Sequence, residues 1–417
     1  MEGREEQGAA ARSCADDSGC GVTDAGAVVH VGPVHGRHAD AGCGQSLAAL
    51  VADRQRDLAA PLSSPERAPT AEATPRRYYA ALDLGTNNCR LLIAQPTRRG
   101  FKVKTSFSRI IRLGEGLARS GRLSEAAIER TIDALQVCAG KLRSLRVERA
   151  GMIATEACRS ASNAGEFLRR AHTETGLDIK VISRETEAKL AVAGCASLLD
   201  VNSDLALVFD IGGGSSELIW LDLSRSRQRW GHSLPERLEA QDCIAAWTSL
   251  PVGVVTLAER FGSRTIDGRT FEAMVTHVAA LLQPFEARHR LRERMRHRRA
   301  HMLGTSGTVT TLAGVHLGLP RYDRSRVDGC WLGARQARAV IADLLSRSFA
   351  ERAAQPCIGP TLAEFVLGGC AILEAMLRAW PCERLRVADR GLREGILATL
   401  MAKDGVYRER RQPYRRR

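Results

Sequence analysis

Two short segments of the chain combine an aspartate with glycines and small polar residues, a composition suited to phosphate binding. They are Asp83-Leu84-Gly85-Thr86-Asn87-Asn88 and Asp210-Ile211-Gly212-Gly213-Gly214-Ser215. Because glycine has no side chain, backbone N–H groups can converge on phosphate oxygens, and Ser, Thr and Asn add neutral donors. The aspartates would repel phosphate directly but can hold Mg²⁺ or its waters. The two segments therefore predict a protein that works on a phosphorylated substrate.

Apolar runs flank both segments, so each is predicted to be the turn of a β-hairpin. Residues 78–82 and 89–94 surround the first turn, and residues 205–209 and 218–221 surround the second. The same unit thus occurs twice, which predicts two related domains that face each other across one cleft. A third turn, Gly304-Thr305-Ser306-Gly307-Thr308, adds N–H and hydroxyl donors, although alone it is equally consistent with a simple loop.

The rest of the ordered chain alternates helices with short strands, which predicts the α/β class. Ser124 is the expected N-cap of a helix over 124–145, a strand follows at 150–154, and the other predicted helices are 163–173, 184–199 and an Arg- and His-rich stretch at 286–301. The expected organisation is a disordered extension (1–76), a first domain (77–203), a second domain (204–402) and a basic tail (403–417).

The composition indicates which classes of binding partner to expect, but it does not identify one of them. The net charge is +14, which favours polyanions, and the apolar content is 44%. The basic stretches are interpreted as solvated surface, and no nucleic acid partner is expected because aromatic residues for base stacking are few. No apolar run is long enough for a membrane span, and no secretory signal is expected. The 12 scattered cysteines indicate reduced thiols in the cytoplasm.

Five ordered motifs carry a specific resemblance. The chain resembles the exopolyphosphatase/guanosine pentaphosphate phosphohydrolase (Ppx/GppA) family over about residues 78–400, through Asp83 to Asn87, Ala154-Thr155-Glu156-Ala157-Cys158-Arg159, Asp210 to Glu217, Gly304 to Thr308, and Leu392-Arg393-Glu394-Gly395. The resemblance implies a two-domain acetate kinase/actin/Hsp70-like (ribonuclease H-like) fold with the active site between the domains. It also implies hydrolysis of the terminal phosphate of polyphosphate or pppGpp with Mg²⁺.

The resemblance also implies roles for single residues. Glu187, at the start of the helix that joins the domains, matches the base that activates water, and Arg159 matches a phosphate-binding arginine. Asp83, Asp210 and Glu217 match acidic residues near the metal. Without the resemblance, Glu187 would be interpreted only as complementing the helix N-terminus.

The chain departs from the family pattern beside Glu187. Arg184 stands where the family usually has Gly, and Thr186 replaces the first of two paired glutamates. Lys189 and Asn88 are further departures. These changes leave open a non-catalytic regulator that binds polyphosphate or an alarmone, and fold analogy leaves open a kinase. Homodimerisation is also left open.

Longer relatives carry a C-terminal HD-type domain, for which this chain is expected to be too short. We hypothesise that the basic tail replaces that domain electrostatically, so deletion of residues 404–417 should weaken binding of long polyphosphate more than short.

Overall fold

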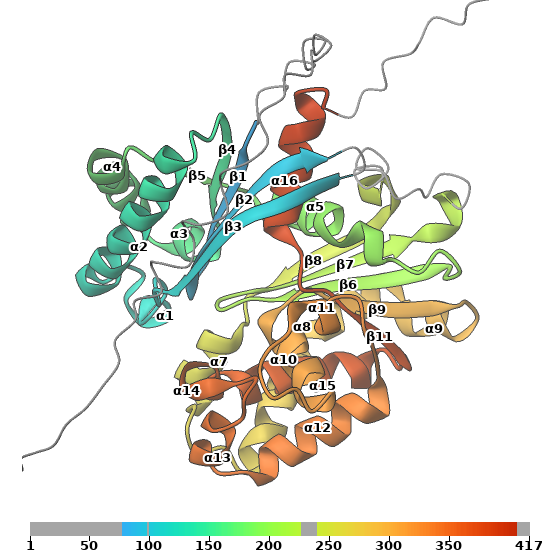
Figure 1. Cartoon of the computed structure of the whole chain (residues 1–417). Coiled ribbons are helices and arrows are strands. Elements are labelled where there is room, and N and C mark those ends of the chain that lie inside the picture. The colour runs from blue at the N-terminus through green and yellow to red at the C-terminus, as the bar shows by residue number, and fades with distance from the viewer. Residues whose placement is uncertain (1–76, 98–99, 227–239, 407–417) are drawn as a thin grey trace, which may run out of the picture. The chain divides into compact units, whose positions relative to one another are not determined.

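The computed structural model describes residues 77–97, 100–226 and 240–406, and these residues form two mixed β-sheets with helices packed on them (Figure 1). The first sheet has the strand order β3-β2-β1-β4-β5. Strands β1 to β3 are antiparallel neighbours, whereas β4 and β5 run parallel to β1. Its strands are β1 (Tyr79–Leu84), β2 (Asn88–Thr97), β3 (Gly100–Ile110), β4 (Arg149–Ala154) and β5 (Lys180–Val181).

The second sheet repeats this topology. Its order is β10-β11-β9-β6-β7-β8, in which β8-β7-β6 is antiparallel and β9 is parallel to both β6 and β11. Hairpin β6–β7 therefore occupies the place that β1–β2 has in the first sheet, as the sequence repeat predicts. The strands are β6 (Leu205–Ile211), β7 (Ser216–Asp222), β8 (Ile244–Leu250), β9 (Ala300–Gly304), β10 (Trp331–Gly333) and β11 (Arg384–Val387).

Strand β1 is buried on both faces, and its alternating side chains enter two different cores. Leu82 and Leu84 face the core formed with α2 (Glu125–Ser144), whereas Tyr79 and Ala81 face α16 (Leu392–Lys403). Helix α2 begins as predicted, because the Ser124 hydroxyl accepts a hydrogen bond from the N–H of Ala127.

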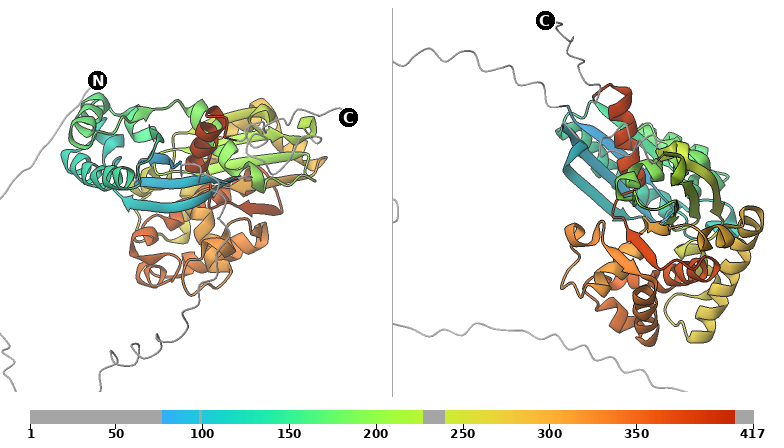
Figure 2. Two further views of the ribbon diagram at one scale, coloured as in Figure 1. Left: turned by 45° about the horizontal axis from the view of Figure 1, so that its top comes forward. Right: turned by 90° about the vertical axis from the view of Figure 1, so that its right-hand side faces the viewer.

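Two helices lie between the sheets, α5 (Arg184–Cys195) and α16 (Figures 1 and 2). Helix α5 packs on the second sheet through Ala188 and Val192, and α16 packs on the first through Ile396 and Leu397. The two helices touch backbone to backbone, because a Cβ on Gly194 of α5 would lie 1.8 Å from the carbonyl oxygen of Gly391. Helix α16, the last element of the described chain, therefore contacts both α5 and the first sheet.

The end of α16 is also tied to the first sheet by polar contacts. The Tyr79 hydroxyl donates to Asp404 over 2.9 Å, and Arg149 lies 3.2 Å from the same carboxylate. A deletion that tests the basic tail should therefore start after Val406, so that this contact is kept. Residues 1–76 and 407–417, which include the predicted extension and most of the tail, lie outside the described residues.

The remaining helices cover the outer faces of the sheets. They are α1 (Leu117–Ser120), α3 (Glu156–Ser160), α4 (Ala164–Thr175), α7 (Val254–Phe261), α8 (Gly268–His289), α9 (Leu291–Arg296), α10 (Gly307–His316), α11 (Arg324–Val327), α12 (Ala334–Ser346), α13 (Phe349–Ala353), α14 (Gly359–Ala363) and α15 (Val366–Ala379). None of the helices in the described ranges combines the length and apolarity that a membrane span needs. Of the nine cysteines in the described ranges, all but Cys330 are buried.

The prediction of one helical stretch over 286–301 is wrong. Helix α8 ends at His289, Arg290 adopts a positive φ of 50°, α9 covers only Leu291–Arg296, and β9 begins at Ala300. The carboxylate of Glu286 accepts hydrogen bonds from the N–H groups of Leu291 and Arg292, which stabilises the break.

Candidate active site

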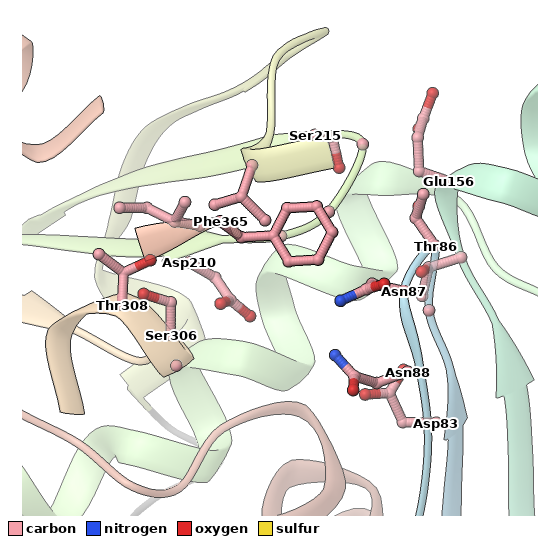
Figure 3. Close-up of a pocket in the computed structure, with 18 of the residues that line it drawn as sticks. Asp83, Thr86, Asn87, Asn88, Glu156, Asp210, Ser215, Ser306, Thr308 and Phe365 are labelled. Carbon is pink, nitrogen blue, oxygen red and sulfur yellow. The ribbon is translucent and has the colours of Figure 1, made fainter. Parts of the chain in front are cut away.

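The two hairpin turns face each other across a pocket of about 980 Å³ that is open to solvent (Figure 3). Asp83, Thr86, Asn87 and Asn88 lie on one side of the pocket, and Asp210 lies with Ser306 and Thr308 on the other. Apart from Arg159, every residue that the sequence assigned to phosphate or metal binding lines this pocket. These residues are Asp83, Gly85, Thr86, Asn87, Asn88, Asp210, Gly212, Gly213, Gly214, Ser215, Glu217, Ser306, Gly307 and Thr308.

The two turns share a backbone hydrogen bond. The N–H of Gly85 donates to the carbonyl of Asn88, and the N–H of Gly212 donates to that of Ser215, each over 2.9 Å. Both turns begin later than predicted, because the aspartate and the residue after it still belong to β1 and β6. Each aspartate is therefore held by a strand, while the glycines supply the turn.

The glycine run allows the two turns to approach closely. A Cβ on Gly213 would lie 3.1 Å from the Cβ of Thr86 and 3.3 Å from that of Asn87, and one on Gly214 would lie 2.9 Å from Oγ1 of Thr86. Asn87 is 6% exposed, and its Oδ1 is a buried polar atom without a protein partner in the described chain. Its hydrogen-bonding capacity is therefore left for a ligand.

We expect Gly213→Ala to weaken binding of a phosphorylated ligand about tenfold, because overpacking between the turns typically costs about 1–2 kcal/mol. Isothermal titration with pppGpp or polyphosphate measures the change. Gly268→Ala is the matched control, because its Cβ would meet no atom within 4 Å. Equal affinities of the two variants would show that the close approach of the turns does not shape the pocket.

The third turn is a strand-to-helix connection, which the sequence did not reveal. Ser306 is the N-cap of α10, and its hydroxyl accepts from the N–H of Val309. Gly307 and Thr308 form the first helical turn and line the pocket. Because helix N-termini carry unpaired N–H groups and partial positive charge, α10 suits an anion here. The signal in the sequence is Ser306 immediately before a helical run.

Two buried carboxylates lie at the base of the pocket. Burial is the main cause that raises the pKa of Asp83 to about 6, and the negative charge of Asp210 adds to this shift. The positive charge of Arg90 opposes it. Burial also raises the pKa of Asp210, again against Arg90. Arg90 lines the pocket because it pairs with Asp83 across the hairpin. It was not predicted, although strand alternation after Asn88 could have pointed to it.

Glu217 also lines the pocket. Its Oε1 accepts hydrogen bonds from the hydroxyls of Ser215 (2.7 Å) and Ser249 (2.9 Å). Burial, foremost, raises the pKa of Glu217 to about 7. Among the described residues, His, Cys, Asp and Glu side chains form no group of three or more that could hold a metal.

Glu187 enters the same pocket from the first turn of α5. The helix begins at the N-cap Ser183, whose hydroxyl accepts from the N–H of Thr186. Arg159 does not line the pocket and lies behind Glu187, where its Nη1 donates to Oε2 of Glu187 over 2.7 Å. Burial raises the pKa of Glu187 and the charge of Glu217 adds to the shift, whereas Arg159 opposes it.

Other lining residues were missed by sequence reasoning. Thr155, Glu156 and Thr311 add polar groups, and an apolar wall consists of Val254, Leu362, Phe365, Val366 and Leu392. The apolar residues come from α7, α14, α15, the start of α16 and the chain between α14 and α15. Only the tertiary arrangement of these helices brings the wall to the turns, so no local pattern could have indicated it.

Two sheets of the same topology, with paired glycine turns on either side of one pocket, define the acetate kinase/actin/Hsp70-like class of α/β folds, as predicted. The model of the Ppx/GppA phosphatase family matches residues 92–404. The chain belongs to this family.

Relatives and a solved structure agree with this assignment. The chain is 30% identical over 327 residues to the guanosine-5'-triphosphate,3'-diphosphate pyrophosphatase of Vibrio vulnificus, and 29% identical over 328 residues to that of Photobacterium profundum. Each match covers 78% of this chain but only 59% of the relative. The structure resembles the Aquifex aeolicus Ppx/GppA family member with a TM-score of 0.61 and 28% identity, covering 79% of this chain and 99% of that one.

Proposed function

We propose that this protein is a hydrolase that removes the terminal phosphate of pppGpp or inorganic polyphosphate. The observation that carries the proposal is the position of Glu187 in the same pocket as two glycine turns and a helix N-terminus. The turns and the helix supply neutral donors for phosphate oxygens, and the Glu187 carboxylate can take a proton from water. The named activity of the two curated relatives, which are longer than this chain, supports the same choice.

In the proposed reaction, water attacks the terminal phosphorus while the Glu187 carboxylate accepts a proton from it. The bond between that phosphorus and the bridging oxygen breaks, and orthophosphate leaves the shortened substrate. Burial keeps the basicity of Glu187 higher than that of an exposed carboxylate, which favours proton transfer near neutral pH. Arg159 holds the carboxylate from behind through its 2.7 Å hydrogen bond.

The pocket would hold Mg²⁺ only together with the phosphates of a bound substrate. Asp83 and Asp210 offer two carboxylates whose burial and mutual repulsion a cation would relieve, and Mg²⁺ is commonly bound by one or two carboxylates together with substrate phosphates. Glu217 offers a third carboxylate at the same pocket. When bound there, the ion would neutralise charge on the phosphate oxygens.

A phosphate-release assay tests the proposal. Wild-type protein is given polyphosphate, pppGpp or ATP, with and without Mg²⁺ and with no phosphoryl acceptor present. We expect steady release from polyphosphate or pppGpp when Mg²⁺ is present. Binding of these compounds without turnover would instead support a regulator, and a requirement for ATP and an acceptor would support a kinase.

The pH dependence should report the protonation state of Glu187. A general base acts only when it is deprotonated, so kcat/KM should rise with pH through the raised pKa of Glu187. Arg159 stabilises the charged carboxylate; Arg159→Met should therefore raise this pKa further and move the rising limb to higher pH. Arg170→Met, which removes the ion pairs of Arg170 with Glu174 and Glu125, residues that do not line the pocket, is the control. A limb that stays in place or moves down in Arg159→Met contradicts the assignment.

A further inference from the structure

Arg184 stands near Glu187, at a position where the family usually has glycine. Its side chain forms an ion pair with a carboxylate at the rim of the pocket. Arg184 approaches Glu156 at two points, with Nη2 2.8 Å from Oε1 and Nε 3.2 Å from Oε2. The side chain of Arg184 is 45% exposed, whereas that of Glu156 is only 11% exposed. A surface arginine thus covers a nearly buried carboxylate.

Glu156 is the centre of a larger set of hydrogen bonds. Its Oε2 also accepts from Nε (3.1 Å) and Nη2 (2.8 Å) of Arg159, and its Oε1 accepts from the Ser160 hydroxyl (2.7 Å). Although burial alone would raise the pKa of Glu156, these donors and Arg184 lower it. The carboxylate is therefore charged, and in Figure 3 it points away from the centre of the pocket.

Arg159 has little freedom in this arrangement. Its Nε and Nη2 bind Glu156, while its Nη1 binds both Glu187 (2.7 Å) and the carbonyl of Ile182 (3.0 Å). A guanidinium has five N–H groups, so these four contacts leave one without a protein partner. Because the guanidinium is planar, fixing one side of it at Glu156 also fixes the side that meets Glu187.

We propose that Glu156 and Arg184 are positioning residues for the proposed hydrolysis: together they fix the guanidinium of Arg159, which in turn holds the carboxylate of Glu187. This inference rests on the proposed function of Glu187. It gives the departure at Arg184 a physical role, since the glycine common in the family could not make the two contacts to Glu156. It also assigns Glu156, which sequence reasoning passed over.

Steady-state kinetics of phosphate release test the inference. Glu156→Gln is expected to lower kcat about tenfold, because a charge-assisted contact is lost on the Arg159 side. Arg184→Ala is expected to lower kcat about threefold, as its ion pair is partly exposed. KM should stay within about twofold in both, because neither residue holds phosphate. Arg184→Lys should not restore kcat fully, since an ammonium cannot reproduce the two-point contact.

Lys189→Ala is the matched control. Lys189 lies on the same helix and makes an exposed ion pair with Glu185 at 2.8 Å, away from Glu156. Its kcat should equal that of wild type. If Glu156→Gln and Arg184→Ala also match wild type, the inference is overturned while the proposed function stands.

A second measurement does not depend on activity. A double-mutant cycle compares the urea unfolding midpoints of four proteins. These are wild type, Glu156→Gln, Glu187→Gln and the double variant. If Arg159 links the two carboxylates, the shifts of the single variants are non-additive. Additive shifts overturn the inference. A wild-type protein that releases no phosphate, together with non-additive shifts, would reject the proposed function but keep the link between Glu156 and Glu187.

Discussion

Glu187→Gln is expected to lower kcat for phosphate release about a thousandfold, the middle of the range that general-base catalysis supplies. The amide keeps the size of the carboxylate but cannot accept a proton from water. The glycine turns and the N-terminus of α10 are untouched, so the affinity for pppGpp or polyphosphate should be similar to that of wild type. Phosphate release and isothermal titration on the same preparation measure both quantities.

Glu185→Gln is the control for this substitution. Glu185 lies on the same turn of α5, but its side chain is exposed and pairs with Lys189. It should retain wild-type turnover. If Glu187→Gln retains more than about a tenth of wild-type kcat, Glu187 is not the general base.

Gly194→Ala is expected to destabilise the protein by about 3 kcal/mol or more, the upper range for overpacking. The new Cβ would lie 1.8 Å from the carbonyl oxygen of Gly391, and a backbone atom cannot move aside by changing rotamer. Helices α5 and α16 would have to separate, which displaces Glu187 from the turns. Urea unfolding followed by circular dichroism measures the loss, and turnover should fall in parallel.

Gly140→Ala is the matched helical control. Gly140 lies in α2, and a Cβ there would meet no atom within 4 Å. Alanine favours helix over glycine by about 1 kcal/mol, so this variant should be more stable than wild type. Similar unfolding midpoints for the two variants would show that contact between α5 and α16 does not require a glycine.

The local parts of the fold and site could be predicted from sequence because their determinants are local. Residues 79–82 are apolar before Asp83, Ser124 caps a periodic helix, and the repeat from Asp83 to Asp210 indicates two equivalent hairpins. Paired hairpins place both turns at one pocket, so the residues of the two turns line it together; their binding of phosphate stays a prediction.

What could not be predicted depends on contacts between distant segments. Strand β3 carries mostly exposed or half-buried side chains, so it lacks the apolar run that marked β1, β2, β6 and β7. The return of α16 to the first sheet shows only in the packing around Tyr79. The ion pairs of Arg159 with Glu156 and Glu187 could not be predicted, because folding brings these side chains together; a contact of Arg159 with phosphate stays a prediction.

The central claim is that this pocket hydrolyses a terminal phosphoanhydride bond, and the products test it most directly. Wild-type protein is incubated with pppGpp and Mg²⁺, without ATP or an acceptor, and followed by ³¹P nuclear magnetic resonance; polyphosphate is examined in parallel. The account predicts orthophosphate as the released species from at least one of the two substrates, with ppGpp in equal amount when pppGpp is cleaved. Release of pyrophosphate, or both substrates left intact, would contradict it.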